Sequence, residues 1–591
     1  MRKGKCLSRT RVGCITVLLS TLLLSACTKP TPLPPPPATE TPSPTHTSPA
    51  ATYTPTPLAE EPSATPEPVI ETTLTPTPSF TATLRVGCLD PVEPLRAMAT
   101  EPSTGDLILT LIYDHLVYPS LDNTYQPSLS TRRETLDDGR TWALELQPGV
   151  RFSDGHPLGA EDVAFTVRLF AQHPGFAYYA GQDDPITSIE ATGTHSVTIT
   201  MNRPVGSIDA LLYWMPILPE HIWASRDITT STALDVATAI GSGPFILSQL
   251  QDGRTSLVSN RDYWMGAPQI DAVVFEEFAD AGALLQGLAV GTIDLINRVP
   301  PEYIDALKAT ANVQVVTGPG LGLRCLRFNV SDETASSGHA ALRDPRVRLA
   351  IAHAVDKQQL IDLALGGTGM RGLSIIPPAL RTWFDASLED VSFDLPAARG
   401  LLDAGGYSDT DSDGIREMPG GEVELVFRLF TAADSPSAGH EAELLGNWLR
   451  QIGIGLSVQA MEPAALESAG CPACDYDLLL VDREAAQDPS HLLAAFTSRS
   501  IASGLNASGY SNPVYDDLYD QQLATVDQGA RQQIISQMQQ VLLEDRPCVV
   551  LYFDLAVQAF RKDRFQNWLY VLNGTLSLAD KRSLLQVRAI P

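Results

Sequence analysis

Proline is distributed unevenly along this chain, and the distribution divides it into parts that cannot share one fold. Residues 28–79 hold 16 of the 45 prolines, together with 14 threonines and 4 serines. This stretch has too few large apolar side chains to offset the entropy lost on ordering, and its prolines keep it extended at up to about 3.1 Å per residue. We therefore predict a disordered tether over residues 27–82 and a globular part from Thr83 onward.

A short apolar run over residues 12–26 precedes the tether. It is shorter than the roughly 20 residues that a membrane-spanning helix needs, and it follows a basic segment, as in signal peptides. It ends in Leu24-Ser25-Ala26-Cys27, which resembles the lipobox of bacterial lipoproteins. The resemblance implies removal of residues 1–26 and attachment of a diacylglycerol anchor to Cys27. An ordinary signal peptide, with Cys27 incidental, is the alternative.

The charge balance excludes two classes of partner. Asp and Glu number 69 against 41 Lys and Arg, which gives a formal net charge of −28. Nucleic-acid binders need clustered basic charge to neutralise phosphates, and anionic membrane surfaces also attract basic segments. We therefore expect no nucleic-acid partner, and membrane contact through the lipid anchor only.

Known catalytic signatures are missing from the sequence. It contains no Gly-x-Ser-x-Gly, His-Glu-x-x-His or Gly-x-x-x-x-Gly-Lys motif, which are the patterns of common hydrolases and nucleotide-binding enzymes. A glycosidase needs only two well-placed carboxylates, which sequence alone does not reveal. We predict that the protein is not an enzyme.

The globular part mixes strand and helix patterns. Alternation of apolar and polar residues predicts strands at residues 83–88, 140–146 and 196–201. Helical spacing, in several places closed by glycine or proline, predicts helices at residues 160–170, 346–365, 441–452 and 530–543. The pattern indicates an irregular α/β fold.

Short motifs also run through the globular part in a fixed order. They include DGRTW at 138–142, FSDGHPL at 152–158, PEHIW at 219–223, GSGPF at 241–245 and DPRVR at 344–348. In this order, over roughly residues 83–585, they resemble family 5 of the solute-binding proteins, the oligopeptide, dipeptide and nickel receptors of ABC importers.

The resemblance implies an α/β, two-lobed periplasmic-binding-protein type II fold with an extra domain on the N-terminal lobe. Residues 83–330 would form the N-terminal lobe, residues 331–548 the C-terminal lobe, and residues 549–591 would return to the first lobe. Hinge closure around a solute is a known use of such a fold. The implied protein is a monomeric receptor, in the periplasm or on the cell surface, that delivers its solute to the permease and ATPase subunits of an ABC importer.

Three segments match ligand-lining parts of the family. Their candidate ligand-binding residues are Glu101, Ser103, Asp482, Arg483, Glu484, Tyr552 and Asp554. In many peptide receptors of the family an aspartate four residues before a proline pairs with the peptide's ammonium group, but here that position is Ala485. Peptide is the expected solute, with Asp482 or Glu484 as a displaced anchor. A sugar or metal-chelate receptor and a non-transporting surface sensor remain alternatives.

An acidic segment and a cysteine pair complete the candidates. Asp409, Asp411, Asp413 and Glu417, with Gly414 at the sixth position, resemble the first half of an EF-hand calcium loop. The twelfth position is Gly420, so the segment is either a structural calcium site or an acidic turn, and we expect no other cofactor. Cys471 and Cys474 lack a second ligand pair for zinc, so a disulfide between them is expected outside the cytoplasm.

Overall fold

The computed structural model describes most of the globular part. The described residues are 82–97, 103–120, 124–171, 185–206, 208–226, 233–251, 253–334, 336–570 and 581–590. The predicted signal peptide, the lipidation site Cys27, the tether and the candidate residue Glu101 lie outside these ranges. Within them, no helix is both long enough and apolar enough to cross a lipid bilayer.

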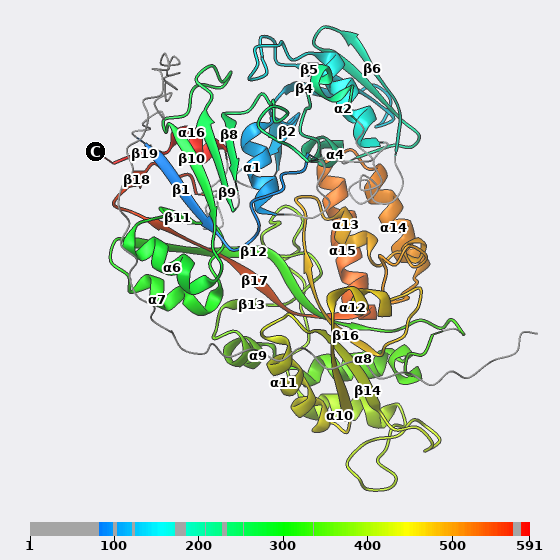
Figure 1. The fold of residues 1–591 in the computed structure, drawn as a ribbon. Coiled ribbons are helices and arrows are strands. Elements are labelled where there is room, and N and C mark those ends of the chain that lie inside the picture. The colour runs from blue at the N-terminus through cyan, green and yellow to red at the C-terminus, as the bar shows by residue number, and fades with distance from the viewer. Residues whose placement is uncertain are drawn as a thin grey trace, which may run out of the picture. The chain divides into compact units, whose positions relative to one another are not determined.

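One mixed sheet connects the two halves of the described chain (Figure 1). Its strand order is β15-β14-β16-β12-β17-β11-β1-β10-β9-β8, and β13 pairs with β17 at the side of this path. The strands are β1 (Thr83–Cys88), β8 (Phe245–Gln251), β9 (Arg254–Ser259), β10 (Ala272–Glu277), β11 (Leu295–Ile296), β12 (Val313–Phe328), β13 (Gly369–Arg371), β14 (Val426–Ala432), β15 (Gly455–Met461), β16 (Leu478–Glu484) and β17 (Cys548–Arg561).

The first lobe is built on β1, which pairs in parallel with both β10 and β11. Its helices are α1 (Thr104–Ile112), α4 (Ile208–Trp214), α5 (Glu220–Trp223), α6 (Ala281–Val290) and α7 (Ile304–Lys308). Sequence signals set the limits of α6, because the Asp280 side chain accepts a hydrogen bond from the Ala283 amide at its start and Gly291 takes the left-handed conformation at its end.

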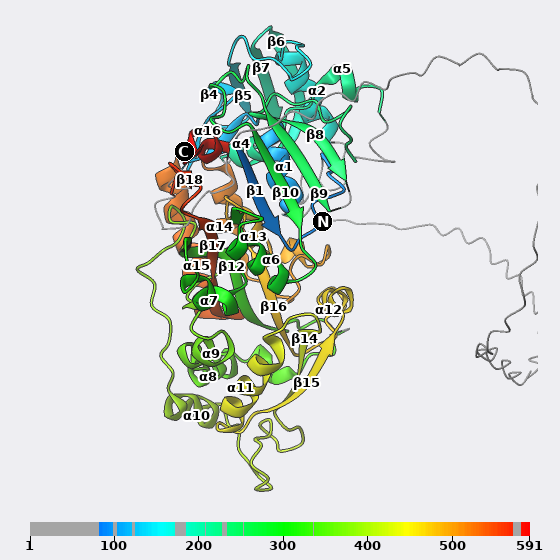
Figure 2. The same cartoon turned by 60° about the vertical axis from the view of Figure 1, so that its left-hand side comes forward.

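The extra domain is a four-stranded antiparallel sheet with one helix. Its sheet order is β4-β5-β7-β6, and Figure 2 shows it at one end of the first lobe. Its apolar side chains, such as Leu144 and Val163, belong to the same buried core as Leu84 of β1. The elements of this region are β2 (Val117–Pro119), β3 (Tyr125–Pro127), β4 (Ser130–Thr135), β5 (Thr141–Leu146), α2 (Ala160–Ala171), β6 (Ile186–Gly193) and β7 (Ser196–Met201).

The second lobe packs helices around β14, β15 and β16, which are parallel to one another. Its own core includes Leu326, Ile351 and Leu449. The helices are α8 (Pro345–Ala354), α9 (Lys357–Ala364), α10 (Leu395–Ala404), α11 (Ala438–Arg450), α12 (Pro463–Ala469), α13 (Ser490–Ala494), α14 (Pro513–Ala524) and α15 (Gln528–Asp545).

The predicted single helix over residues 346–365 is wrong, because the structure has two helices there. Val355 adopts an extended conformation between them, and the Asp356 side chain accepts a hydrogen bond from the Gln359 amide to start α9. The buried Lys357 then donates to the Gly372 carbonyl, 3.0 Å away. An N-cap aspartate therefore interrupts a helical pattern that is continuous in sequence. The other predicted helices and strands are confirmed within a few residues at each end.

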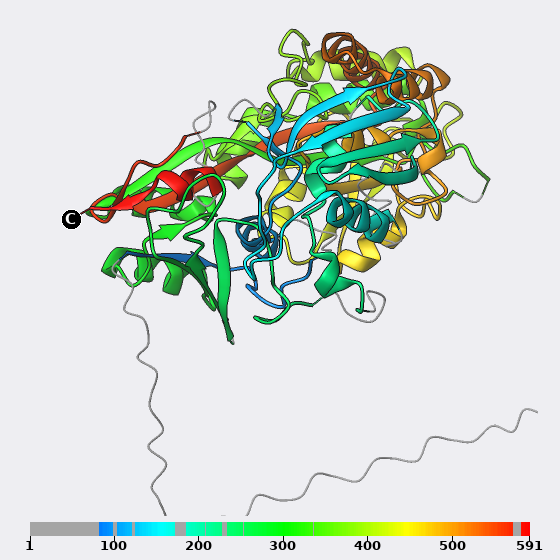
Figure 3. The ribbon, with the colours of Figure 1, turned by 90° about the horizontal axis from the view of Figure 1, so that it is seen from above.

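Two long antiparallel strands, β12 and β17, pass from one lobe to the other side by side. Figure 3 shows the red C-terminal strands returning along the green strands of the first lobe. Along β12 the packing changes from the first-lobe core at Val316 to the second-lobe core at Leu323. Along β17 it changes between Phe553 and Val557. The predicted lobe boundaries at 330/331 and 548/549 thus lie at the ends of the crossing strands. The packing changes from one core to another within each strand, several residues away from those boundaries.

The chain ends in the first lobe. Strands β18 (Phe565–Gln566) and β19 (Arg588–Ala589) pair with each other, and α16 (Lys581–Gln586) lies just before β19. Lys581 reaches the buried Asp114, with 2.7 Å between Nζ and Oδ1. The two lobes also meet away from the crossing strands, because the Gly206 amide donates to the Leu523 carbonyl at 2.7 Å. A side chain at position 206 would collide with Thr525 of the second lobe.

Candidate ligand-binding site

Polar side chains gather on one face of β16, β12 and β17, where these strands pass between the lobes. In the sheet register Asp482 lies opposite Arg324, and Arg324 lies opposite Tyr552. Successive side chains of a strand point to opposite faces, so Glu484 shares the face of Asp482, and Asp554 shares the face of Tyr552. Four of the seven predicted ligand residues, Asp482, Glu484, Tyr552 and Asp554, therefore come together.

Arg324 organises the buried floor of this face. Its Nε donates to Oε2 of Glu441 at 2.7 Å, and its Nη1 donates to Oδ2 of Asp482 at 2.7 Å. Tyr552 donates its hydroxyl to the other oxygen of Glu441 at 2.9 Å. Arg324 and Glu441 are buried, so their charges neutralise each other away from water. Burial opposes the charge of Arg324, but Glu441 and Asp482 outweigh it and raise the pKa of the guanidinium.

Asp554 stands beside this network without sharing in it. Among the residues that the structure describes, none donates a hydrogen bond to its carboxylate. Protein atoms desolvate the carboxylate although the residue stays in contact with water, and together with the negative charges of Asp482 and Glu484 this raises its pKa to about 6. The carboxylate fits there because position 322 is glycine: a Cβ on Gly322 would lie 2.0 Å from Oδ2 of Asp554.

Glu484 links the face to the first lobe. Its Oε1 lies 3.9 Å from Nη2 of Arg298, which follows β11 in the first lobe, and both side chains are exposed. This long, solvated pair is weak, and Arg324 is shared between Glu441 and Asp482, so the carboxylates of this face outnumber the cations paired with them. A cationic group with N–H donors, such as an ammonium, is the ligand chemistry that this acidic face can hold most strongly.

Two other predicted residues, Ser103 and Arg483, do not join this face, and neither does Ala485, the position of the family's aspartate anchor. Ser103 caps α1 through hydrogen bonds with Asp106, so its hydroxyl serves the helix. Arg483 lies between Asp482 and Glu484 in β16, so it points to the opposite face. Ala485 is buried in the second-lobe core, and its amide donates to the Leu321 carbonyl at 3.0 Å. A ligand anchor at that position is absent from this chain.

Sequence reasoning missed Arg324 and Glu441. Arg324 stands inside the apolar run Leu321-Gly322-Leu323-Arg324-Cys325-Leu326, and an arginine within a buried strand signals a buried anionic partner. That signal points to Arg324 without identifying Glu441, which lies 117 positions away in sequence.

The acidic segment forms a tight turn in the second lobe. Carboxylate oxygens of Asp409, Asp411 and Asp413 lie within 4.8 Å of one another and are exposed. Each also accepts a backbone amide of the turn. Glu417 does not join them, because it is buried and its Oε2 accepts the Thr410 amide at 2.8 Å. The calcium prediction therefore rests on three of its four residues.

Cys471 and Cys474 form a disulfide in the structure. Both cysteines are buried, next to the segment that leads into β16. The pair closes a short turn in the second lobe and contributes nothing to the acidic face.

Comparisons with known proteins agree on one family. A family profile described as bacterial extracellular solute-binding proteins, family 5 Middle, matches residues 124–503. The oligopeptide-binding protein AppA of Bacillus subtilis is 27% identical over 467 residues, which are 77% of this chain and 83% of AppA. The structure of AppA in complex with a nonapeptide aligns with a TM-score of 0.68 at 23% identity, over 87% of this chain and 100% of that one.

A second solved structure shares the fold. NikA from Brucella suis in complex with Fe(III)-EDTA aligns with a TM-score of 0.71 at 22% identity, over 84% of this chain and 99% of NikA. The fold is the predicted α/β, two-lobed type II periplasmic-binding fold.

Proposed function

Because the chain belongs to family 5 of the bacterial extracellular solute-binding proteins, we propose that its solute is a peptide whose ammonium group is held by Asp482, Glu484 and Asp554. The single observation that carries this proposal is the acidic face on the crossing strands. Three carboxylates lie there, and the buried cation beneath them, Arg324, is shared between Glu441 and Asp482.

The proposal explains why three mutually repelling carboxylates lie together on the crossing strands. Like-charged carboxylates repel each other in the unliganded protein. A bound ammonium would relieve this repulsion, and the relief would add to its binding free energy. Peptides also carry main-chain donors and acceptors that can pair with strand-like backbone. The curated relative AppA is named as an oligopeptide-binding protein, which supports this ligand class.

Hinge closure would report occupancy to an importer. The lobes are joined by β12 and β17 and touch again between Gly206 and Leu523. A ligand held by both lobes stabilises the closed arrangement by its difference in affinity for the two states. The protein acts here by binding alone, as a monomer, and hands its solute to the permease and ATPase subunits of an ABC importer.

Native mass spectrometry of the purified full-length protein, mixed with a defined peptide library, tests the proposed solute. We expect one peptide to bind per chain, and N-acetylation of that peptide to weaken binding about 10- to 100-fold because it removes the ammonium charge. Asp554→Asn should weaken binding similarly. Asp305→Asn is the matched control, since Asp305 is a highly exposed carboxylate on α7. Equal affinity for free and N-acetylated peptides would overturn the assignment.

The anchor is a separate part of the proposal. The motif Leu24-Ser25-Ala26-Cys27 supports lipidation at Cys27, which would keep the protein on the outer side of the bacterial membrane through the tether. We expect cells to incorporate labelled fatty acid into the wild-type protein and not into Cys27→Ala. Label in both proteins would contradict the assignment of Cys27.

A further inference from the structure

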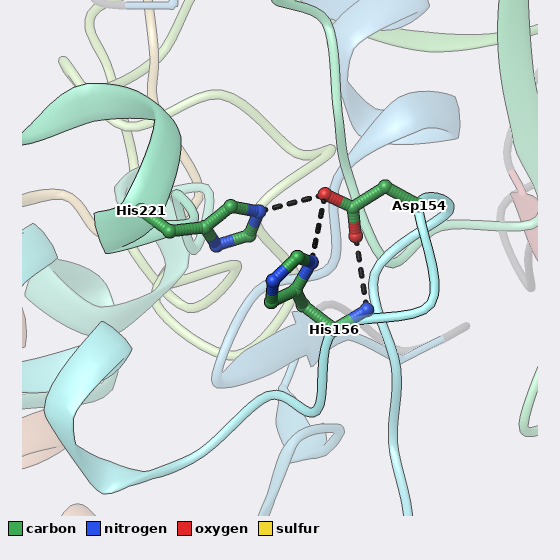
Figure 4. Close-up of side chains that lie close together, drawn as sticks. All are labelled: Asp154, His156 and His221. Carbon is green, nitrogen blue, oxygen red and sulfur yellow. Dashed lines mark hydrogen bonds and ion pairs between the residues drawn. The ribbon is translucent and has the colours of Figure 1, made fainter.

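Two histidines and an aspartate converge on the first lobe, away from the acidic face. Nε2 of His221 lies 2.7 Å from Oδ2 of Asp154, and Nδ1 of His156 lies 3.2 Å from the same oxygen. Figure 4 shows both imidazole nitrogens pointing at this carboxylate from different directions. The two rings stack with centroids 3.9 Å apart. One potential ligand atom from each residue thus lies within 4.8 Å of the others.

The backbone holds Asp154 and His156 in a fixed turn. The His156 amide donates to Oδ1 of Asp154 at 3.0 Å, which leaves Oδ2 directed at the histidines. The turn is closed by the Phe152 amide, which donates to the His156 carbonyl at 2.9 Å. Gly155 supplies a positive φ of 91° between the two ligands, a conformation that favours glycine.

His221 is positioned independently by α5. The buried Trp223 anchors this short helix in the first-lobe core, and the Glu220 amide donates to Oδ1 of Asp162 on α2 at 3.0 Å. The ring of Phe152 packs edge-on against the His221 ring, with centroids 6.0 Å apart. Both sides of the cluster are therefore built on packed elements, and the cluster itself remains open to solvent.

We propose that Asp154, His156 and His221 form a binding site for a divalent transition-metal ion of the zinc type. Two imidazoles and one carboxylate are a donor set that suits zinc and its neighbours, whereas calcium and magnesium prefer oxygen donors. Tetrahedral zinc with bonds of 2.0–2.2 Å requires its ligand atoms to be about 3.3 Å apart. Oδ2 of Asp154 lies 3.2 Å from Nδ1 of His156 and 2.7 Å from Nε2 of His221, so small side-chain shifts would admit the ion. Three protein ligands also leave a fourth position open to water or to a donor from another molecule.

The site goes beyond the proposed solute-binding function. Its residues lie in the turn before α2 and in α5, and none belongs to the crossing strands. A bound ion would fasten the 151–158 turn of the extra domain to α5. Its two histidine ligands, His156 and His221, are 65 positions apart in the sequence. The metal is then a clip within the first lobe, and solute binding does not depend on it.

Zinc titration of the purified full-length protein without a histidine tag, after removal of metals with a chelator, tests the proposal. Competition with a chromophoric zinc chelator gives stoichiometry and affinity. We expect one zinc ion per chain in the wild type, and at least about 100-fold weaker binding in His221→Gln and Asp154→Asn, because each variant removes a direct ligand. Cobalt in place of zinc should give the visible absorption of a four-coordinate site in the wild type and should not give it in His221→Gln or Asp154→Asn.

Two control variants separate this site from other groups. His440→Gln removes an exposed histidine of α11 in the second lobe, and Asp411→Asn alters the acidic turn. Both should keep wild-type zinc affinity and stoichiometry, and millimolar calcium should not displace zinc. The proposal would be overturned if the wild type bound no zinc. It would also be overturned if His221→Gln and Asp154→Asn bound zinc as tightly as the wild type does. Circular dichroism of each variant checks that a loss of binding does not come from unfolding.

Discussion

Two carboxylates of this molecule, Asp114 and Asp554, have opposite surroundings. Asp114 is fully buried in the first lobe and accepts hydrogen bonds from Ser242, Tyr263, Trp264 and Lys581. Asp554 is in contact with water, accepts no hydrogen bond from any residue that the structure describes, and faces the negative charges of Asp482 and Glu484.

The difference separates a carboxylate that holds the fold from one that is available to a ligand. A buried charge persists only when paired and hydrogen-bonded, and Asp114 meets that condition entirely within the chain. Asp554 has a raised pKa and no hydrogen-bond donor among the described residues, a combination that is common for carboxylates of functional sites. Substitutions at these two carboxylates and at nearby charged groups test this contrast.

The largest effect is expected at the buried pair. Asp114→Asn leaves the buried Lys581 ammonium without its counter-charge, and breaking such a pair costs about 3–5 kcal/mol of unfolding free energy. Denaturant unfolding monitored by fluorescence measures it. The double variant Asp114→Asn with Lys581→Met should recover part of the loss, and a double variant that is less stable than the single one would contradict this account.

A smaller loss of unfolding free energy is expected for a substitution at Glu441, beneath the acidic face. Glu441→Gln removes the charge that Arg324 and Tyr552 both contact. Because Arg324 keeps Asp482 as a partner, we expect about 2–3 kcal/mol of destabilisation, as for hydrogen bonds to charged groups. The same denaturant curves provide the value. A change under 0.5 kcal/mol would mean that Asp482 alone suffices to hold Arg324.

At Asp554 we expect a substitution to raise the free energy of unfolding, in contrast to the two losses above. Its pKa is about 6 in the folded chain against about 3.9 in an unfolded one, so the folded state binds more protons between these values. The unliganded protein therefore loses stability as pH rises from about 4 to about 6. Asp554→Asn lacks this loss and should be more stable than the wild type above pH 6, by about 1 kcal/mol after solvent screening, with no difference near pH 4.

Thermal unfolding across this pH range measures the effect at Asp554, and Asp305→Asn again serves as the control. If Asp554→Asn were as stable as the wild type at pH 7, the carboxylate would not be strained by its neighbours.

The smallest effect is expected in the acidic turn. Asp411 is exposed and accepts one backbone amide, so Asp411→Asn should change stability by less than about 0.5 kcal/mol. Repeating the measurement with millimolar calcium tests the calcium prediction. Calcium binding would raise the unfolding temperature of the wild type more than that of the variant, and equal temperatures would exclude a calcium site at this turn.

Much of the fold follows from local sequence signals. The strand at Thr83–Cys88 and the helix around Val163 and Val167 were predictable because their apolar periodicity agrees with the final burial. The break at Asp356 was not, because its N-cap side chain competes with a helical pattern that continues on both sides. Local signals also cannot say where β12 changes from one core to the other.

The site was only partly predictable for a related reason. Asp482, Glu484 and Asp554 are near one another in strand register, and motif matching to a family finds such positions. Glu441 reaches the site from a helix whose place depends on the whole second lobe. Asp154 and His156 lie within a motif that indicates the fold, and only the tertiary structure brings His221 beside them.

Asp554 lies where the packing of β17 changes from one lobe to the other, beside the equivalent point of β12 at Gly322. If the lobes close by turning about the crossing strands, this point moves less than the bodies on either side. On the proposed function, Asp554 would therefore keep its place between the lobes whether the cleft is open or closed. Capture of a ligand ammonium would then begin with electrostatic attraction, at a rate that salt slows, and enclosure by the lobes would follow.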